Sequence, residues 1–226
     1  MNDFRKIRLD STLSRRVTAV ELVHDVLRNA ILRGELTGGS RLVQTEIASE
    51  LGMSTTPVRE AMRELATDGL ITLDSHRIGI VRTPDWDEMS EIVAMRQALE
   101  PVATERAMAN ITDQQLDRAN RLAEELAHDE LDLGSWVQRN IAFHNVFHEA
   151  TASVRIAPVM LSLDSAAGVF AAQAQRVNPQ IREQAVNDHF SLIDAYRARD
   201  LDRAIEIERE HVMLPLRAAS LDDELK

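Results

Sequence analysis

The sequence predicts a mainly α protein, in which an N-terminal winged helix-turn-helix precedes an all-α antiparallel helical bundle. Two short helical patterns joined at a glycine, followed by two strand patterns, occupy the first third of the chain, and only helical patterns follow. The charge divides at the same place. Residues 1–83 hold 12 basic and 11 acidic residues, whereas residues 84–226 hold 14 and 26. Such an asymmetry indicates two functionally distinct parts.

The first part is expected to comprise an N-terminal arm over residues 1–16 and the winged helix-turn-helix over residues 17–83. Apolar residues recur at helical spacing from Val17 to Arg33. The stretch LTGGSRL is expected to be a loop, and a short helix follows at Thr45–Leu51. Gly52 then permits the tight turn that this motif requires.

The second helix of the motif is predicted at Thr56–Asp68. Thr56 is expected to cap this helix, with Pro57 in the first helical position, where its missing N–H is harmless. Two strands, LITLD and IGIVRT, are joined by SHR and form the hairpin of the wing. Pro84 closes the unit.

The second helix presents a polar face that is typical of nucleic-acid contact. Arg59 is expected in the first turn, where the helix dipole disfavours a cation, and Arg63 adds a like charge at i,i+4. An anionic partner would offset both electrostatic costs. DNA is such a partner, because hydroxyl groups can bind its phosphates and arginine can bind the paired acceptors of guanine. The residues predicted to contact DNA are Arg41, Ser54, Thr55, Thr56, Arg59, Arg63, Arg77 and Gly79.

The second part, residues 84–226, is expected to form an all-α domain of six helices. They are predicted near residues 85–109, 112–128, 134–150, 155–175, 179–198 and 200–218. Short connections between amphipathic helices favour an antiparallel bundle.

Composition restricts the classes of protein further. The chain contains no cysteine, which excludes disulfides and thiolate metal sites. The N-terminus lacks the apolar segment of a signal peptide. The most apolar run, APVMLSLDSAAGVFAAQA, is interrupted by Asp164, which favours a buried helix over a membrane span. We expect a soluble, cytoplasmic protein that does not bind membranes.

Histidines in the second part form a candidate metal site. Asn140, His144 and His148 follow one another at i,i+4 on a single helical face, one turn after Trp136. Imidazole is the commonest protein ligand for metals, and an i,i+4 pair can chelate one ion. Taken singly, each histidine is better explained as a surface or hydrogen-bonded core residue, and Trp136 as a core residue.

The stretch LVQTEIASELGMSTTPVREAMRELATDGLI resembles the DNA-binding domain of the GntR family of bacterial transcription regulators. The helical remainder, residues 84–226, is similar to the FCD domain of the FadR-like branch, which implies an effector-binding and dimerisation domain. This resemblance implies a homodimer, a palindromic double-stranded operator and a small-molecule effector. The protein is expected to act as a repressor of transcription. Arg59 and Arg63 take the family's DNA-contacting places, whereas Thr45 stands where some members carry arginine.

The metal-binding type of FCD domain is similar to this chain in NIAFH, NDHFSLIDAYRARD and EREHV. The resemblance implies four ligands for one divalent ion: Asn140, His144, His189 and His211. Zinc is expected first, then nickel or manganese. Asp is common at the first position, and the neutral amide leaves more of the ion's charge to attract a small organic acid. His148 is expected to be a bystander.

Arg96 resembles a position of the family that faces the effector pocket. The alternative for Arg96 is an intrahelical ion pair with Glu100. Two other functions remain open at this point. The histidine site could serve a metal-dependent hydrolase, for which Asp188 or Glu210 would be the general base, or a direct sensor of the metal. Since nothing pairs these carboxylates with a nucleophile, we expect no catalytic residues.

Overall fold

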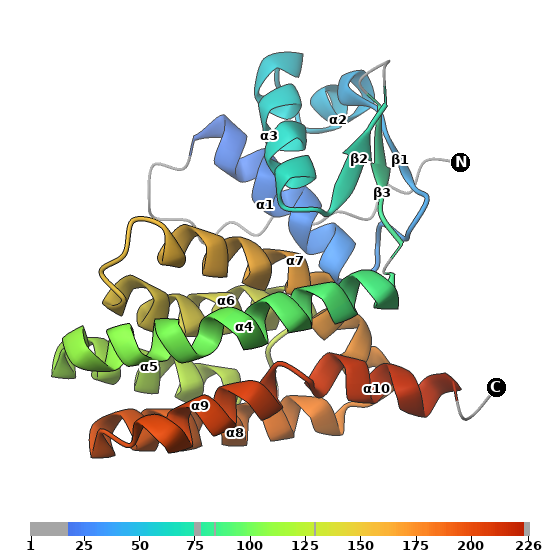
Figure 1. The fold of residues 1–226 in the computed structure, drawn as a ribbon. Helices are drawn as coiled ribbons and strands as arrows, with labels where there is room; N and C mark the ends of the chain where they lie inside the picture. The colour runs from blue at the N-terminus through green and yellow to red at the C-terminus, as the bar shows by residue number, and fades with distance from the viewer. Residues whose placement is uncertain (1–17, 75–77, 84, 129, 224–226) are drawn as a thin grey trace. The chain divides into compact units, whose positions relative to one another are not determined.

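The computed structural model describes residues 18–74, 78–83, 85–128 and 130–223, and the arm expected over residues 1–16 lies outside this part. The chain divides into two compact units, Met1–Pro84 and Asp85–Lys226. The elements of the first unit are α1 (Ala19–Leu32), β1 (Arg41–Leu42), α2 (Gln44–Glu50), α3 (Thr55–Thr67), β2 (Ile71–Leu73) and β3 (Gly79–Val81) (Figure 1).

A capping box starts α1. The Thr18 hydroxyl accepts a hydrogen bond from the Glu21 N–H at 3.2 Å, and Glu21 Oε2 accepts one from the Thr18 N–H at 2.7 Å. These reciprocal bonds satisfy N–H groups that a helix start otherwise leaves without partners. The first predicted helix is confirmed within two residues at each end.

The helix α3 begins earlier than predicted. Ser54 takes the N-cap position and Pro57 is the third residue of the helix, so the expected cap at Thr56 was wrong. Pro57 still fits, because N–H groups in the first turn have no intrahelical acceptor. Arg59 is therefore the fifth residue, and the dipole cost expected of it is small because the effect is confined to the first turn.

Three short strands form an antiparallel sheet in the order β1-β3-β2. The strands β2 and β3 are the predicted hairpin, whose register pairs Ile71 with Val81. The strand β1 was expected to be loop, and it pairs Arg41 with Ile80. Two residues carry no readable alternation, so this strand exists only because β3 presents an edge with which it can pair.

The helix-turn-helix packs as its spacing predicts. Gly52, in the turn, has a φ of +64°, a left-handed conformation that glycine adopts without strain. The buried residues through which the helices of the unit pack are each at most 4% exposed and include Val23, Leu27, Ile47, Ala48, Val58, Ala61, Met62 and Leu65.

His24 connects α1 to the end of α3. Its Nε2 lies 2.8 Å from Asp68 Oδ2, and its Nδ1 lies 3.5 Å from Asp25 Oδ1. Hydrogen bonds to Asp25 and Asp68 raise the pKa of His24 to about 9.

We expect the stability of the first unit to fall as the pH rises from about 6.5 through about 9. The folded state holds the His24 proton more tightly than the unfolded state does, so the contribution is complete below the unfolded pKa and is lost as the pH passes the folded pKa. Amide hydrogen exchange in α1 and α3, corrected for intrinsic rates, measures this dependence. The contribution should disappear in His24→Gln, and an unchanged pH slope in that variant would contradict the assignment.

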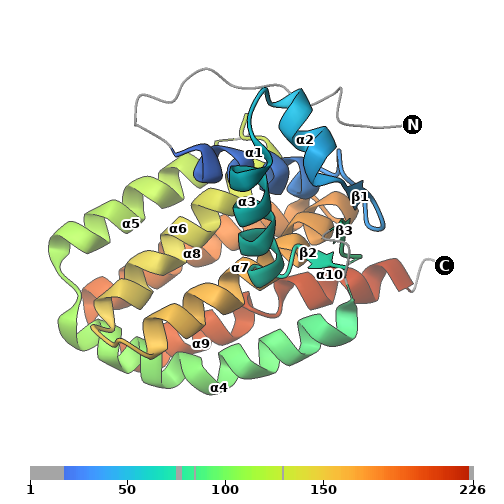
Figure 2. The same ribbon diagram turned by 90° about the horizontal axis from the view of Figure 1, so that it is seen from above.

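The second unit is a bundle of helices whose axes run in similar directions (Figures 1 and 2). They are α4 (Trp86–Asn110), α5 (Asp113–Leu126), α6 (Leu133–Ala150), α7 (Ile156–Val177), α8 (Gln180–Ala198), α9 (Leu201–His211) and α10 (Leu214–Asp223). Short connections join consecutive helices, as expected for the antiparallel bundle.

The last predicted helix, residues 200–218, is two helices. The helix α9 ends at His211, and α10 starts at Leu214. Pro215 explains the break, because proline lacks the N–H that would bond the carbonyl of His211 and its ring clashes with that carbonyl. His211 is thereby placed at the end of a helix.

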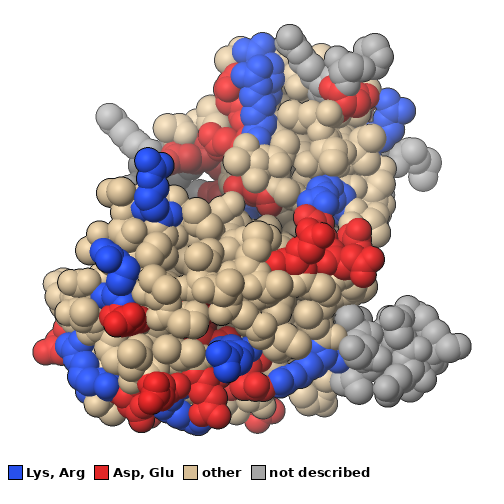
Figure 3. Space-filling model, viewed as in Figure 1, with Lys and Arg blue, Asp and Glu red and all other residues tan. Residues whose placement is uncertain are grey.

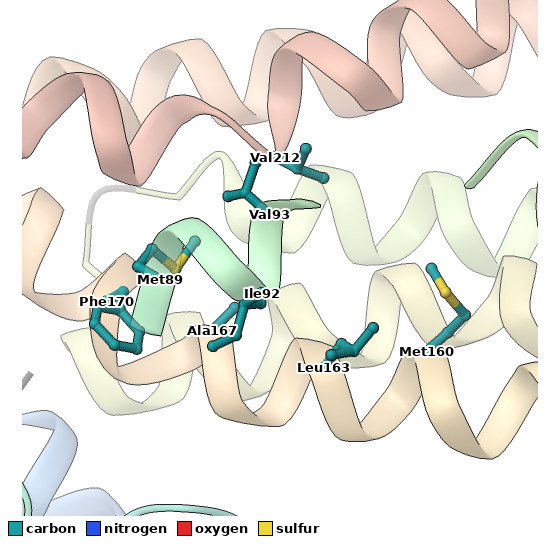
Figure 4. Packing of buried hydrophobic residues seen from close by; sticks show 8 residues of the cluster. All are labelled: Met89, Ile92, Val93, Met160, Leu163, Ala167, Phe170 and Val212. Atoms are coloured by element: carbon teal, nitrogen blue, oxygen red, sulfur yellow. The ribbon is translucent and has the colours of Figure 1, made fainter. Parts of the chain in front are cut away.

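The core of the bundle forms where α4 meets α7 and the junction of α9 with α10. Figure 4 shows Ile92 of α4 beside Ala167 of α7, and Val93 directed toward Val212. By length and composition α7 could cross a membrane. Its residues Met160 and Phe170 are 0% and 4% exposed, so α7 packs as a core helix, as predicted.

Candidate functional site

The outward side of α3 carries most of the residues predicted to contact DNA. Ser54, Thr55 and Thr56 are exposed at its start. The side chains of Arg59 and Arg63 are 36% and 58% exposed. Hydroxyl groups and guanidinium groups gathered at one helix can reach the phosphate oxygens and guanine acceptors of a duplex.

Glu60 changes the interpretation of the two arginines. Its Oε1 lies 3.3 Å from Arg59 Nε and 3.1 Å from Arg63 Nη1. The like-charge cost is therefore offset within the helix, so this cost does not by itself indicate an external anion, and the contact of both arginines with DNA stays a prediction. Exposed pairs of this kind contribute little free energy. DNA can therefore replace Glu60 as their partner at low cost.

The other predicted DNA contacts fall on the sheet and the wing. Arg41 is exposed on β1. Arg77 lies outside the described residues. Gly79 is buried in β3, where a Cβ would lie 2.7 Å from Met62 Cε and 3.0 Å from Ile71 Cδ1. Close packing of α3 on the sheet explains this glycine, and its contact with DNA stays a prediction.

Three histidines from three helices meet in the second unit. His144 comes from α6, His189 from α8 and His211 from the end of α9, and they can offer nitrogen atoms that lie within 4.8 Å of one another. Their exposed fractions are 2%, 1% and 8%. The structure thus brings together the three histidines predicted to bind a metal.

Several polar atoms of this cluster are buried without hydrogen-bond partners among the described residues. They are both ring nitrogens of His144, both ring nitrogens of His189, and Oδ1 of Asn140. An unpaired buried polar group costs about 1–3 kcal/mol. Imidazole nitrogens and an amide oxygen can all ligate a divalent ion. The residues present therefore fit such an ion.

The protonation states suit the same chemistry. Burial holds the pKa of His144 well below its usual value, and His211 and His189 act in the same direction. Burial also lowers the pKa of His189. Both rings are neutral at neutral pH and can offer a lone pair. His211 Nδ1 lies 3.2 Å from Asp188 Oδ2, and a carboxylate in this position orients a ligating histidine through its second nitrogen.

A buried ionic cluster centred on Arg96 adjoins the histidines. Arg96 Nη2 lies 2.9 Å from Glu100 Oε1 and 3.9 Å from Glu208 Oε2, and Arg96 Nη1 lies 3.1 Å from Asp164 Oδ1. His148 Nε2 lies 2.7 Å from Asp164 Oδ2. The pair of Arg96 with Glu100, one of the two alternatives for this arginine, is therefore present. His148 is part of the ionic cluster through its contact with Asp164.

The charges of this cluster are unequal. Burial opposes ionisation of Asp164, but Arg96, His148 and His211 together outweigh it and lower the Asp164 pKa. Burial and the neighbouring Glu100 raise the pKa of Glu208 well above its usual value, which favours the protonated form of Glu208. Arg96 is thus the central cation of a buried group of carboxyl side chains.

A cavity with a volume of about 50 Å³ adjoins both clusters. Its lining includes Arg96, Asn140, His211, Trp136 and Gln175, and most of the remaining lining is apolar. Trp136 is 2% exposed, so it is both a core residue and a wall of the cavity. Two of the four predicted metal ligands, Asn140 and His211, therefore line the same small cavity as Arg96.

Two segments of the sequence match known protein families. Residues 19–80 match the bacterial regulatory proteins of the gntR family, and residues 91–213 match the FCD domain. The chain belongs to the GntR family. Its FCD domain places it in the FadR-like branch, as the resemblance implied.

Named relatives agree with this assignment. The chain is 28% identical over 192 residues to the transcriptional regulator McbR of Escherichia coli, covering 79% of this chain and 82% of McbR. It is 27% identical to the repressor GlaR of the same bacterium, over 84% of this chain and 90% of GlaR. It is 39% identical to a probable D-xylose utilization operon repressor of Paenarthrobacter nicotinovorans, of which the match covers 46%.

Solved structures show the same fold. The Escherichia coli protein McbR/YncC superposes with a TM-score of 0.75 at 23% identity, over 93% of this chain and all of that chain. A GntR regulator from Rhodococcus gives a TM-score of 0.73 at 22% identity, over 90% and 99%. This GntR-family member is a DNA-binding transcription regulator.

Sequence reasoning missed several residues of the site. Glu60, Glu208 and Gln175 were not singled out, and Asp164 was noted only as an interruption of an apolar run. A polar residue within an apolar helical stretch is the available signal, and both Asp164 and Gln175 carry it. Their roles depend on neighbours that are distant in sequence.

Proposed function

We propose that this regulator is a cytoplasmic, ligand-responsive repressor whose FCD domain binds one divalent metal ion and a small carboxylate. The observation that carries the proposal is a set of buried atoms beside a cavity: Oδ1 of Asn140 and the ring nitrogens of His144 and His189. None of these atoms has a hydrogen-bond partner among the residues that the structure describes. Two of the relatives are named as repressors, which favours repression.

The proposed ligands of the metal are Asn140, His144, His189 and His211. Zinc is the first expectation, followed by nickel or manganese, because imidazole favours borderline metals. When bound, the ion supplies a positive charge that attracts an anionic effector. All four side chains would bind as neutral ligands and leave that charge uncompensated.

The proposed carboxylate lies in the cavity against the metal site. Arg96 and His211 line this space, and the proposed acid would share the Arg96 guanidinium with Asp164 and Glu100. The small volume favours a small acid. Its binding changes operator affinity only through a different affinity for two conformations of the protein, and typical couplings are about 1–3 kcal/mol.

A second copy of the chain is the proposed partner of α4. Met95 and Val102 of this helix are 47% and 50% exposed, and Ala98 between them is also exposed, so an apolar stripe follows i,i+3,i+7 spacing. Figure 3 shows a largely uncharged surface over the middle of α4, in contrast to the intermixed charges over α8 and α9. An apolar stripe of this kind suits a homodimer that reads a palindromic operator.

Removal of one histidine tests the metal site. We expect His144→Ala and His211→Ala to lose stoichiometric metal in elemental analysis, while His128→Ala, a substitution of an exposed histidine, retains it. Wild-type protein should gain about 2.7 kcal/mol of stability at a metal concentration 100 times its Kd, and the two variants should gain none. Retention of metal by both variants would contradict the site.

Operator titration separates an effector site from a direct metal sensor. The effector proposal expects metal alone to leave operator affinity nearly unchanged, with the shift appearing only when an acid is added to metal-loaded protein. A full shift with metal alone would instead support a sensor of the metal. The same titration measures the number of chains bound per operator.

A further inference from the structure

A second end of the cavity is marked by Gln175 on α7. This side chain lines the cavity and is 7% exposed. Its Nε2 atom is buried and has no hydrogen-bond partner within the described part of the chain. A buried amide N–H without an acceptor is energetically costly. A ligand that places an acceptor here therefore forms a hydrogen bond that no described residue forms with this amide.

Three helices place this end away from the metal site. Trp136 precedes the proposed ligand Asn140 by four residues on α6, and Ile181 precedes Ala185 by four residues on α8. Four residues of helix span about 6 Å. All of these residues line the cavity together with His211 and Gln175, so the cavity extends from Asn140 and His211 toward a separate end about one helical turn away.

Small residues form the wall between the two ends. Ala167, Gly168 and Ala171 of α7 line the cavity, and Asp164 and Gln175 lie before and after them on the same helix. Such a wall suits a narrow hydrocarbon chain, which buries apolar area without needing polar partners. The cavity thus has an anion-attracting end, an apolar middle and an end with an unpaired amide donor.

The second end favours a neutral group. The charged residues that line the cavity, Arg96, Asp164 and His211, belong to the ionic cluster or the metal site. Arg182 lies 6.0 Å from the centroid of the Trp136 ring, but it donates to the carbonyl groups of Leu131 and His128 and does not line the cavity. A second carboxylate would be buried beside Gln175 without a cation, at high cost.

We infer that the cavity selects a carboxylic acid whose far end carries a neutral hydrogen-bond acceptor, such as a ketone, ester or ether oxygen, and that Gln175 is the residue that recognises it. This inference rests on the proposed metal and carboxylate site. It names the class of acid within that site.

Three acids of equal chain length test the inference: 4-oxopentanoate, pentanoate and glutarate. Calorimetric titration of metal-loaded full-length protein should show that 4-oxopentanoate binds about 2- to 12-fold more tightly than pentanoate, the effect of one neutral hydrogen bond. Glutarate should bind more weakly than either. In Gln175→Leu the keto acid and pentanoate should bind equally, whereas Gln173→Leu, on the same helix outside the cavity lining, should keep the preference.

Thermal unfolding without acid provides a check on folding. Gln175→Leu removes an unpaired amide, so its Tm should equal or exceed that of the wild type. Equal binding of the keto acid and pentanoate to the wild type, or a preserved preference in Gln175→Leu, would overturn the inference while leaving the effector site intact. Tightest binding by glutarate would overturn the requirement for a neutral group. Failure of all three acids to bind metal-loaded wild type would overturn the effector site and the inference together.

Discussion

Replacement of Arg96 by methionine should unfold the helical unit at markedly lower urea concentration than wild type. Arg96 is about 94% buried and is paired with Glu100 and Asp164, so its removal leaves buried carboxylates without their cation. Breaking a buried pair in this way costs about 3–5 kcal/mol. Because a domain has only about 5–15 kcal/mol of stability, the loss should be a large fraction of the total. Tryptophan fluorescence reports it, since both Trp86 and Trp136 lie in this unit.

Arg118 provides the matched control. It also pairs with a carboxylate, Glu149, at 3.0 Å, but both side chains are nearly half exposed. Exposed pairs contribute about 0–1 kcal/mol, so Arg118→Met should unfold close to wild type. Equal destabilisation by Arg96→Met and Arg118→Met would show that the buried cluster does not depend on the cation at its centre.

Replacement of Arg59 by alanine should weaken operator binding by about 1–3 kcal/mol, the effect of losing one arginine contact to a base. Its partner in the described structure is Glu60, an exposed and weak interaction that gives way to guanine at low cost. The measurement is the affinity for a duplex selected from random sequences, at one fixed salt concentration, because phosphate contacts make all such affinities depend on salt.

Arg203→Ala controls for the loss of a positive charge. Arg203 on α9 forms an i,i+3 pair with Glu206, as Arg63 does with Glu60, but it lies in the helical unit. Its removal should leave operator affinity unchanged and fold stability nearly so. If Arg59→Ala and Arg203→Ala bound the selected duplex equally well, the assignment of α3 to base recognition would be wrong.

The sequence alone determined the order of the elements and the face of α3. The helical spacing of apolar residues such as Val58 and Leu65, together with the turn residue Gly52, was sufficient to predict them, because these signals act within one or two helical turns. The N-terminal edge of α3 was misplaced, since several first-turn positions tolerate Pro57 and cap residues are interchangeable there. The two-residue strand β1 was missed because it depends on pairing with β3.

The proposed metal ligands were predicted as a set, but by resemblance to a family. Among these four residues, spacing along the chain could connect only Asn140 with His144, whereas His189 and His211 come from other helices. The break before Pro215 also escaped prediction, and it places His211 at a helix end beside the cavity.

Only the tertiary structure decided the environment of each polar side chain. Arg96 has a local partner in Glu100, which a sequence can suggest, but its pairing with Asp164 and Glu208 requires three helices to pack together. Gln175 looked like any polar residue until its amide was found buried without a partner among the described residues. Burial and pairing arise from contacts between distant segments. Helical periodicity sets which face of a helix turns inward, whereas the packing of other helices determines what that face meets.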